Sequence, residues 1–289
     1  EKVALLPHLG ALTEAHALPY STYLRTVSWM AELDHRAIVS QVIGAMRELE
    51  EKAVDEKTRP AFQKWANETL ERHVRRLGFR QKKGEPVGHT LLRRKVVRAS
   101  ALLAGNEAYV EKARQTVSDY FEKPEAVGGS ELRFSLIIAA EKGDAELWEK
   151  IHGAISQAPS PSKRVALIKA LGFFDEPELE RKSLDAFLGE RLRAQDFWTV
   201  VGPTLREPAT ARVTWSWLTE NYDAIVEKLG KRSSGSLPWL SSGFCSEDEI
   251  SEIEEFWKGR VGELPGAERA LAKSIESVER CANYKDYIR

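Results

Sequence analysis

The sequence predicts an all-α protein, and three observations support this prediction. Apolar residues recur at helical spacing, as at Leu92, Val96, Ala99 and Leu103, which places them on one side of a helix. Short polar residues precede helix-forming runs, and glycines follow many of them. No long stretch alternates apolar and polar residues with the period of two that is typical of strands. We therefore expect helices from one end of the chain to the other.

The boundaries of these helices are marked by caps and glycines. Predicted helix starts, where a short side chain can accept hydrogen bonds from free backbone N–H groups, lie at Asp34, Asn106, Asp144 and Asp248. Predicted helix ends, where glycine tolerates a left-handed conformation, lie at Gly78, Gly105, Gly143 and Gly172. A second apolar stripe predicts a helix near the end of the sequence, through Leu271, Ile275, Val278 and Ala282.

Successive helices are joined by short links, which favours antiparallel neighbours. Residues 99–121, 132–155 and 165–188 each have the pattern of a helix–turn–helix, at intervals close to the ~40 residues of HEAT repeats. The predicted fold is an irregular α-superhelix of HEAT-like antiparallel helix pairs. We expect long loops at 81–88 and 230–243. Residues 1–289 are expected to form a single domain, truncated at its N-terminus because the sequence starts inside a predicted helix.

Composition excludes several classes of protein. With 42% hydrophobic and 30% charged residues, the chain is globular and not disordered. The 43 Lys and Arg residues are balanced by 44 Asp and Glu residues, so no nucleic-acid partner is expected. No apolar run reaches the ~18 residues of a membrane span, and no membrane segment is expected. Cys245 and Cys281 could form one bridge, but we expect two free thiols.

A search for catalytic and ligand-binding motifs finds none. Zinc peptidases need two histidines four residues apart on a helix, with a glutamate between them, and none of the six histidines fits this spacing. Phosphate-loop and nucleophile-elbow motifs are absent, and Cys245 is interpreted as a packed thiol. The sequence therefore predicts no catalytic residue, no cofactor and no metal in this chain. At least six of the eight tryptophans are expected to pack in the core.

Three stretches nevertheless resemble the C-terminal domain of M1 zinc aminopeptidases. The first is Leu-Leu-Arg at 91–93, followed by Val-Val at 96–97 and Gly-Asn at 105–106; the second runs from 194–196 to 215–222; the third comprises 244–245, 253–257 and 267–276. The chain departs from the family pattern at Thr210 and Ala211, where Gly-Arg is usual, although Arg212 follows. It also has Tyr222 in place of a tryptophan.

The resemblance implies a non-catalytic domain that caps the catalytic cleft of a parent aminopeptidase and limits peptide access. The implied partners are the catalytic domain of the same parent chain, which would hold the zinc and is absent here, and peptide substrates. Arg93 and Arg212 lie in or beside family-like motifs. We predict that they bind the carboxylate of a peptide, because a guanidinium can donate two parallel hydrogen bonds to it. This prediction requires that both guanidinium groups open onto the concave surface and that neither has a bidentate protein carboxylate. The alternative is that each arginine is a surface residue or the partner of a structural carboxylate, which is the more common role of an arginine on a helix.

Two other hypotheses stay open at this point. The chain could be a stand-alone α-solenoid scaffold that binds a peptide or protein partner in its concave face. An upstream His-Glu-x-x-His domain in the same reading frame would decide against that scaffold. An unrecognised helical enzyme is disfavoured because the motif search is empty.

Overall fold

The computed structural model describes residues 2–206 and 208–288, and these are all-α, as predicted. Contacts divide the chain into two compact units. The first comprises residues up to Ala139 together with residues from Tyr287 onward, and the second comprises Ala140–Asp286. Each unit is described by itself. The HEAT-like pairing and the single-domain organisation of 1–289 stay predictions.

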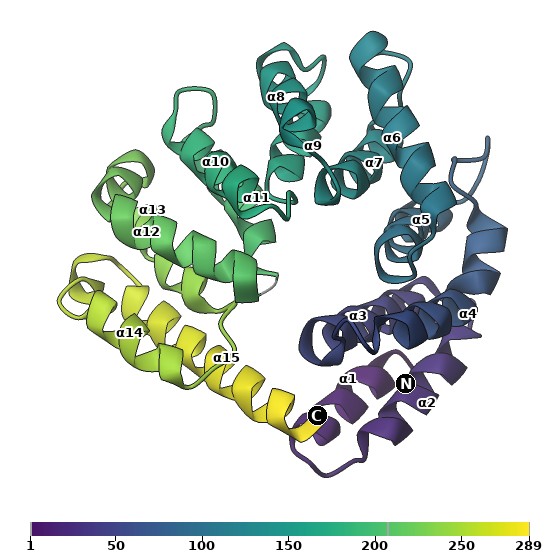
Figure 1. The fold of residues 1–289 in the computed structure, drawn as a ribbon, viewed down its shortest axis with the longest axis horizontal. Helices are drawn as coiled ribbons and strands as arrows, with labels where there is room; N and C mark the ends of the chain where they lie inside the picture. The colour runs from purple at the N-terminus through teal and green to yellow at the C-terminus, as the bar shows by residue number, and fades with distance from the viewer. Residues whose placement is uncertain (1, 207, 289) are drawn as a thin grey trace. The chain divides into compact units, whose positions relative to one another are not determined.

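The first unit is built from seven labelled helices (Figure 1). They are α1 (Lys2–Glu14), α2 (Tyr20–Ala31), α3 (Arg36–Ala53), α4 (Arg59–Leu77), α5 (Val87–Arg98), α6 (Glu107–Glu122) and α7 (Gly129–Glu141), which ends just beyond the boundary. The apolar stripe predicted from Leu92 to Leu103 is confirmed, because all four of its residues are buried in the core of this unit. They pack there with Val39 and Met46 of α3, so α3 and α5 lie against one another.

A short π-helix, η1 (Ala99–Leu103), continues α5 without a break. The wide turn leaves the backbone oxygen of Ser100 free to accept from the Asn106 N–H at 2.9 Å, and the Asn106 amide nitrogen lies 3.2 Å from the Ser100 hydroxyl. Asn106 then caps α6 by accepting from the Tyr109 N–H at 3.3 Å. The π-turn and the cap therefore share one side chain.

Two of the four predicted helix starts are confirmed. Asn106 caps α6, and Asp144 caps α8 by accepting from the Leu147 N–H at 2.9 Å. Asp34 and Asp248 were wrong as caps: α3 begins at Arg36 after His35, and Asp248 is already inside α14. The carboxylate of Asp34 is drawn instead to the Arg76 guanidinium, 2.7 Å away.

The predicted glycine ends differ in their cause. Gly78 ends α4 at φ 63°, and Gly105 follows η1 at φ 64°, so both use the left-handed region as predicted. Gly172 ends α9 at φ −80°, which any residue can adopt. A Cβ at Gly172 would lie only 2.1 Å from the backbone oxygen of Val200, so close approach requires the glycine there.

The second unit contains helices of very different length, from four to 22 residues, and several of them are joined by short 3₁₀ turns. The helices are α8 (Ala145–Ala154), α9 (Pro161–Leu171), α10 (Pro177–Leu188), α11 (Phe197–Val201), α12 (Pro208–Leu229), α13 (Lys231–Ser234), α14 (Asp248–Trp257) and α15 (Ala267–Ile288). The predicted helix pairs at 132–155 and 165–188 match α7–α8 and α9–α10, whereas 99–121 contains η1 and α6. The neighbouring helices α8 and α9 pack together, as do α10 and α12.

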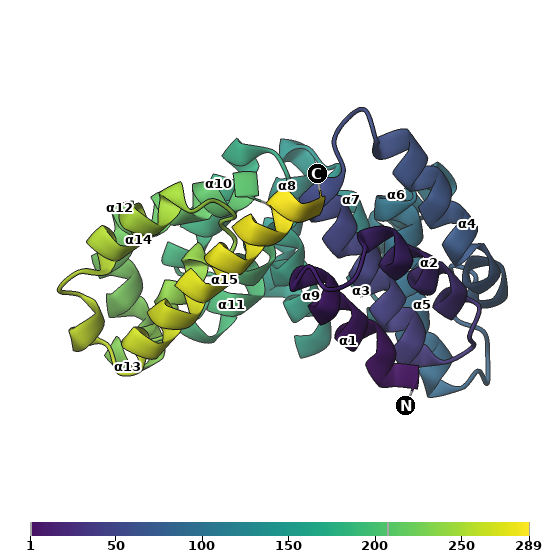
Figure 2. The same ribbon diagram turned by 90° about the horizontal axis from the view of Figure 1, so that it is seen from below.

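The C-terminal helix α15, yellow in Figure 2, is confirmed as a helix, but its predicted stripe is only partly right. Val278 is fully buried, whereas Leu271, Ile275 and Ala282 are half-buried. The fully buried side also includes a polar residue, Ser274, whose hydroxyl lies 2.9 Å from that of Ser241. A hydrophobicity pattern could not find this buried hydroxyl pair.

The loop prediction holds in one place and fails in the other. Residues 81–86 form a loop before α5 begins at Val87. The prediction of a loop at 230–243 was wrong, because this segment contains α13 and the 3₁₀ helix η5 (Leu237–Ser241). The side chains of Leu237 and Leu240 are fully buried, and this burial orders a segment whose glycines and serines suggested a loop.

Six of the eight tryptophans are at least half-buried, as predicted. Trp148, Trp215, Trp217 and Trp257 are fully buried, Trp65 and Trp239 half-buried, and Trp29 and Trp198 exposed. Trp215 faces the rings of Phe244 and Phe256, whereas Trp217 faces Phe187. α12 therefore buries two of its sides. Within the described residues, no helix is both long and apolar enough to cross a membrane.

Candidate functional site

Arg93, the first predicted peptide contact, is buried in α5 with 2% of its surface exposed. Its two terminal nitrogens donate to the two carboxylate oxygens of Glu85, and its Nε donates to the backbone oxygen of Leu77 at 3.1 Å. The Thr90 hydroxyl donates to the same carboxylate at 2.9 Å. The hydrogen bonds from Arg93 lower the pKa of Glu85 to about 2, more than its burial raises that pKa, and Thr90 adds to the lowering.

The local sequence explains this burial. Arg93 lies between Leu92 and Val96 on the side of α5 that faces the core, so its guanidinium has to find a partner away from water. The loop at 81–86 directly precedes α5, and its Glu85 accepts the hydrogen bonds of this guanidinium. Sequence reasoning missed Glu85, although an arginine within an apolar stripe is a usable signal for a buried ion pair.

A pocket of about 160 Å³ lies beside Arg93 in the first unit. It is lined by the segment after α4, by Thr90 and Arg93 of α5, and by the first turn of α7. The rings of Phe79 and Phe134 line it and meet edge to face at 5.1 Å. Both rings are nearly buried, so the pocket offers little apolar surface to a ligand.

Arg212, the second predicted peptide contact, ties α12 to α14. Its Nη1 donates to both oxygens of Glu252 at 2.9 and 2.7 Å, and its Nη2 donates to Glu249 at 2.8 Å. The guanidinium also lies over the Phe244 ring, 4.4 Å from its centre. The Arg212 side chain keeps 42% of its surface exposed, in contrast to the enclosed Arg93.

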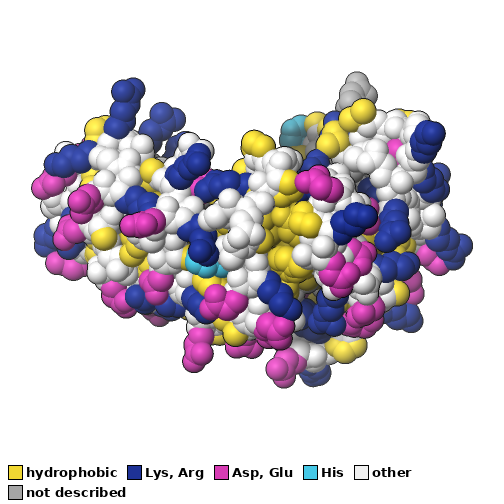
Figure 3. All heavy atoms as spheres, turned by 90° about the horizontal axis from the view of Figure 1, so that it is seen from above, with side chains coloured by type: hydrophobic (Ala, Val, Ile, Leu, Met, Phe, Trp, Pro, Cys, Tyr) yellow, Lys and Arg dark blue, Asp and Glu magenta, His cyan; other side chains and the backbone are white. Residues whose placement is uncertain are grey.

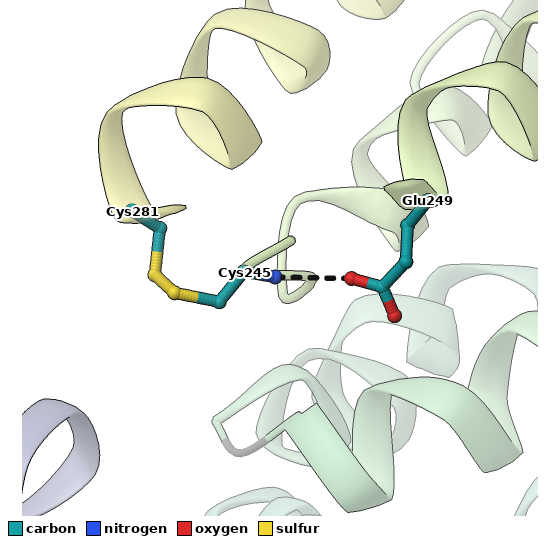
Figure 4. The surroundings of a disulfide bond; sticks show 3 residues. All are labelled: Cys245, Glu249 and Cys281. Atoms are coloured by element: carbon teal, nitrogen blue, oxygen red, sulfur yellow. Dashed lines mark hydrogen bonds between the residues drawn. A yellow bond between two sulfur atoms is a disulfide. The ribbon is translucent and has the colours of Figure 1, made fainter. Parts of the chain in front are cut away.

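The carboxylates that bind Arg212 also hold other groups. The Trp215 indole nitrogen donates to Glu252 at 2.6 Å, and the Cys245 N–H donates to Glu249 at 3.3 Å (Figure 4). Cys245 is joined to Cys281 of α15 by a disulfide. The expectation of two free thiols was therefore wrong. The pairing escaped sequence reasoning because 36 residues separate the cysteines and only the packing of α15 brings them together.

The structure thus places both predicted arginines in internal ion pairs, within separate units. Neither guanidinium meets the requirement that it lack a bidentate protein carboxylate. Both are placed by the packing of helices: Arg93 by the apolar stripe of α5, and Arg212 by the contact of α12 with α14. Binding of a peptide carboxylate by Arg93 or Arg212 stays a prediction, and it would require the peptide to displace Glu85 from Arg93, or to approach Arg212 beside Glu249 and Glu252.

The described residues contain no group of three or more His, Cys, Asp or Glu side chains that could hold a metal ion. The buried His73 has its Nε2 2.6 Å from the backbone oxygen of Ala31, and the His152 Nδ1 is 3.0 Å from an Arg191 nitrogen. Both cysteines are in the disulfide. These residues do not fit a zinc site.

The described residues form an array of helices in which both predicted contact residues are in internal ion pairs. This defines the class of the chain as an all-helical domain. The family model described as ERAP1-like C-terminal domain matches residues 1–280. The chain belongs to this family, which forms the C-terminal helical domain of M1 aminopeptidases.

Curated relatives agree with this membership. The mitochondrial aminopeptidase 2 of Saccharomyces cerevisiae is 23% identical over 291 residues, which cover 98% of this chain and 30% of that protein. The alanine/arginine aminopeptidase of the same yeast is 23% identical over 98% of this chain and 34% of that protein. Aminopeptidase M1 of Arabidopsis thaliana is 25% identical over 74% of this chain and 25% of that protein. The chain spans about a third of the length of the two yeast relatives.

Proposed function

We propose that this chain caps the catalytic cleft of an M1 zinc aminopeptidase and limits the access of peptides to it. The observation that carries the proposal is the match of residues 1–280 to the C-terminal domain family. The yeast aminopeptidase 2 that this chain resembles is about three times as long, so it has room for a further domain. The zinc chemistry would belong to the catalytic domain of the same parent protein, because the described residues here offer no set of metal ligands. A cap of this kind acts by enclosing the site and by opening for exchange.

Deletion tests this role. Two proteins are expressed from the complete reading frame that encodes this chain. One has the natural sequence, and the other lacks these 289 residues. Both proteins are assayed with an aminoacyl chromogenic substrate and with peptides of increasing length. We expect the natural form to discriminate between peptides by length, and the deleted form to lose this discrimination while it still cleaves the chromogenic substrate.

Two results would contradict the proposal. If the deleted form keeps the same dependence on peptide length, the domain does not limit access. If the reading frame holds no His-Glu-x-x-His segment, there is no cleft to cap, and the stand-alone scaffold that binds a peptide or protein partner becomes the better hypothesis.

Within the proposed role, the two arginines differ as contacts for a peptide carboxylate. Arg93 is enclosed, and a peptide would have to displace Glu85 from it. Arg212 has an exposed edge that a carboxylate can approach. In the complete protein, Arg212→Ala should weaken the binding of long peptides and leave the binding of dipeptide-like substrates nearly unchanged. Equal loss for both lengths would assign Arg212 a structural role alone.

A further inference from the structure

Three packed helices of the first unit carry five basic side chains that have no carboxylate partner among the described residues. They are Arg36 and Arg47 of α3, Arg94 and Lys95 of α5, and Arg133 of α7. Arg36 and Lys95 are exposed, and the other three are half-buried. We call this set the basic face. Elsewhere in the unit, Arg59 and Arg76 are paired with acidic residues.

Acidic residues are sparse in two of the three helices that carry the basic face, although Glu48 directly follows Arg47 and Glu131 lies two residues before Arg133. No Asp or Glu occurs from Arg36 to Arg47, and none occurs in the whole of α5. On the surface seen in Figure 3, basic and acidic side chains are mixed. The whole chain has a net charge of only −1.

The fold brings the three helices together. Leu92 and Val96 of α5 pack in one core cluster with Val39 of α3. Val97 of α5 packs in a second cluster with Phe134 of α7. With those residues turned inward, the neighbouring Arg94, Lys95 and Arg133 lie on the accessible sides of their helices.

The cations act on one another. The Lys95 side chain is exposed, but the protein around it still removes part of its hydration. This partial desolvation is the first cause that lowers the pKa of Lys95, and the positive charges of Arg36, Arg47 and Arg94 lower it further. The pKa of Arg94 is lowered by burial and then by Arg133. No acidic residue is among the groups that shift either pKa. An anion bound here would relieve this repulsion.

We propose that the basic face binds an acidic segment of a peptide, through side-chain carboxylates of that peptide. The proposal rests on the proposed peptide-handling role and names the class of peptide that the domain prefers. Arg36 and Arg47 are eleven residues apart on α3, or about 16 Å. An extended peptide covers that length with about five residues, so carboxylates spaced along a chain can reach cations that one small anion cannot.

The test compares two peptides that differ only in side-chain charge. Both are fluorescently labelled, acetylated and amidated, so that neither has a terminal carboxylate; one contains several Glu residues, and the other has Gln in their place. Binding to the full 289-residue chain is followed by fluorescence anisotropy. We expect the Glu peptide to bind at least about tenfold more tightly, and this preference to fade between about 50 and about 300 mM salt.

Variants locate the binding. The double variant Arg36→Gln, Lys95→Gln should bind the Glu peptide about tenfold more weakly than the natural chain does, and its affinity for the Gln peptide should be unchanged. The matched control is Lys150→Gln with Lys258→Gln, which removes the same charge from exposed, paired lysines of the other unit and should change nothing. Because the first pair of substitutions removes repulsion, its unfolding midpoint should stay the same or rise, which excludes misfolding as the cause.

Three outcomes would overturn the proposal. Equal binding of the Glu and Gln peptides removes the preference for acidic segments and leaves the proposed capping role intact, because that role is tested by deletion. Equal weakening by the control variant means that total charge, and not the basic face, governs binding. Tighter binding of a sulfated polysaccharide than of the Glu peptide, with the same loss in the first variant, assigns the surface to polyanions in general.

Discussion

Trp215 and Arg212 of α12 share one acceptor, because both donate to the Glu252 carboxylate, at 2.6 Å from the indole nitrogen and at 2.7 and 2.9 Å from the guanidinium. A fully buried ring and a partly exposed cation are thereby fixed to the same residue of α14. This relationship makes the α12–α14 contact the best place to measure what holds the second unit together.

Trp215→Ala should lower the free energy of unfolding by about 3–5 kcal/mol, because it leaves a large cavity where the ring is 1% exposed. Trp215→Phe should cost much less, since it keeps most of the ring and loses one hydrogen bond worth about 1 kcal/mol. Urea unfolding measures both. Trp29→Ala, at an exposed ring, is the control and should stay within about 0.5 kcal/mol of the natural chain.

Glu85→Gln should destabilise the first unit by about 3–5 kcal/mol at neutral pH, because it leaves the enclosed Arg93 without its counter-charge. The pKa of Glu85 is lowered from 4.5 to about 2. The stabilisation by the ionised carboxylate is therefore fully present above pH 4.5 and is lost as the pH falls toward 2. Unfolding curves of both proteins should converge in that range. A difference that stays constant down to pH 2 would contradict this assignment.

The buried His73 should make the chain less stable as the pH falls below 6.5. Its Nε2 must donate to the backbone oxygen of Ala31, since a carbonyl can only accept, and its Nδ1 faces Arg76 at 3.5 Å. Burial lowers the pKa of His73, and the charges of Arg76 and Arg72 lower it further, against the raising effects of the Ala31 hydrogen bond and of Asp34. Because the pKa of His73 is lower in the folded chain than in the unfolded chain, the unfolded chain binds a proton first as the pH falls, and this lowers the free energy of unfolding.

An NMR titration of the His73 ring should accordingly give a midpoint below 6.5. His73→Gln should remove part of the dependence of the unfolding free energy on pH below that value, where one proton accounts for at most about 1.4 kcal/mol per pH unit. A His73 midpoint at or above 6.5 would show that the ring accepts a second proton in place.

Replacing both Cys245 and Cys281 with Ala should lower the free energy of unfolding by about 2–4 kcal/mol, because the disulfide closes a loop of 36 residues. A reductant should lower the thermal midpoint of the natural chain and leave that of the double variant unchanged. Two free thiols in mass spectra of the unreduced, alkylated chain would contradict the disulfide.

The sequence was most informative where one kind of force acts over a short stretch. The stripe from Leu92 to Leu103 and the caps Asn106 and Asp144 depend on spacing along one helix, so periodicity and capping chemistry predict them. The disulfide and the partner of Arg93 depend on packing between segments, which no local pattern contains. Residues 230–243 failed as a loop for the same reason, because burial of Leu237 and Leu240 outweighs the preference of glycine and serine for turns.

The π-turn at Ala99–Leu103 has a consequence for chain length. A π-turn is an α-helical turn with one residue added, so removing one residue there would restore a regular helix. The deletion would also rotate α6 by about 100° relative to α5. The hydrogen bond between the Asn106 side chain and the Ser100 hydroxyl would break, and the Tyr109 ring would no longer pack against Phe79. The extra residue thus sets the angular phase between the two helices, and relatives that lack it should carry a compensating insertion before α6.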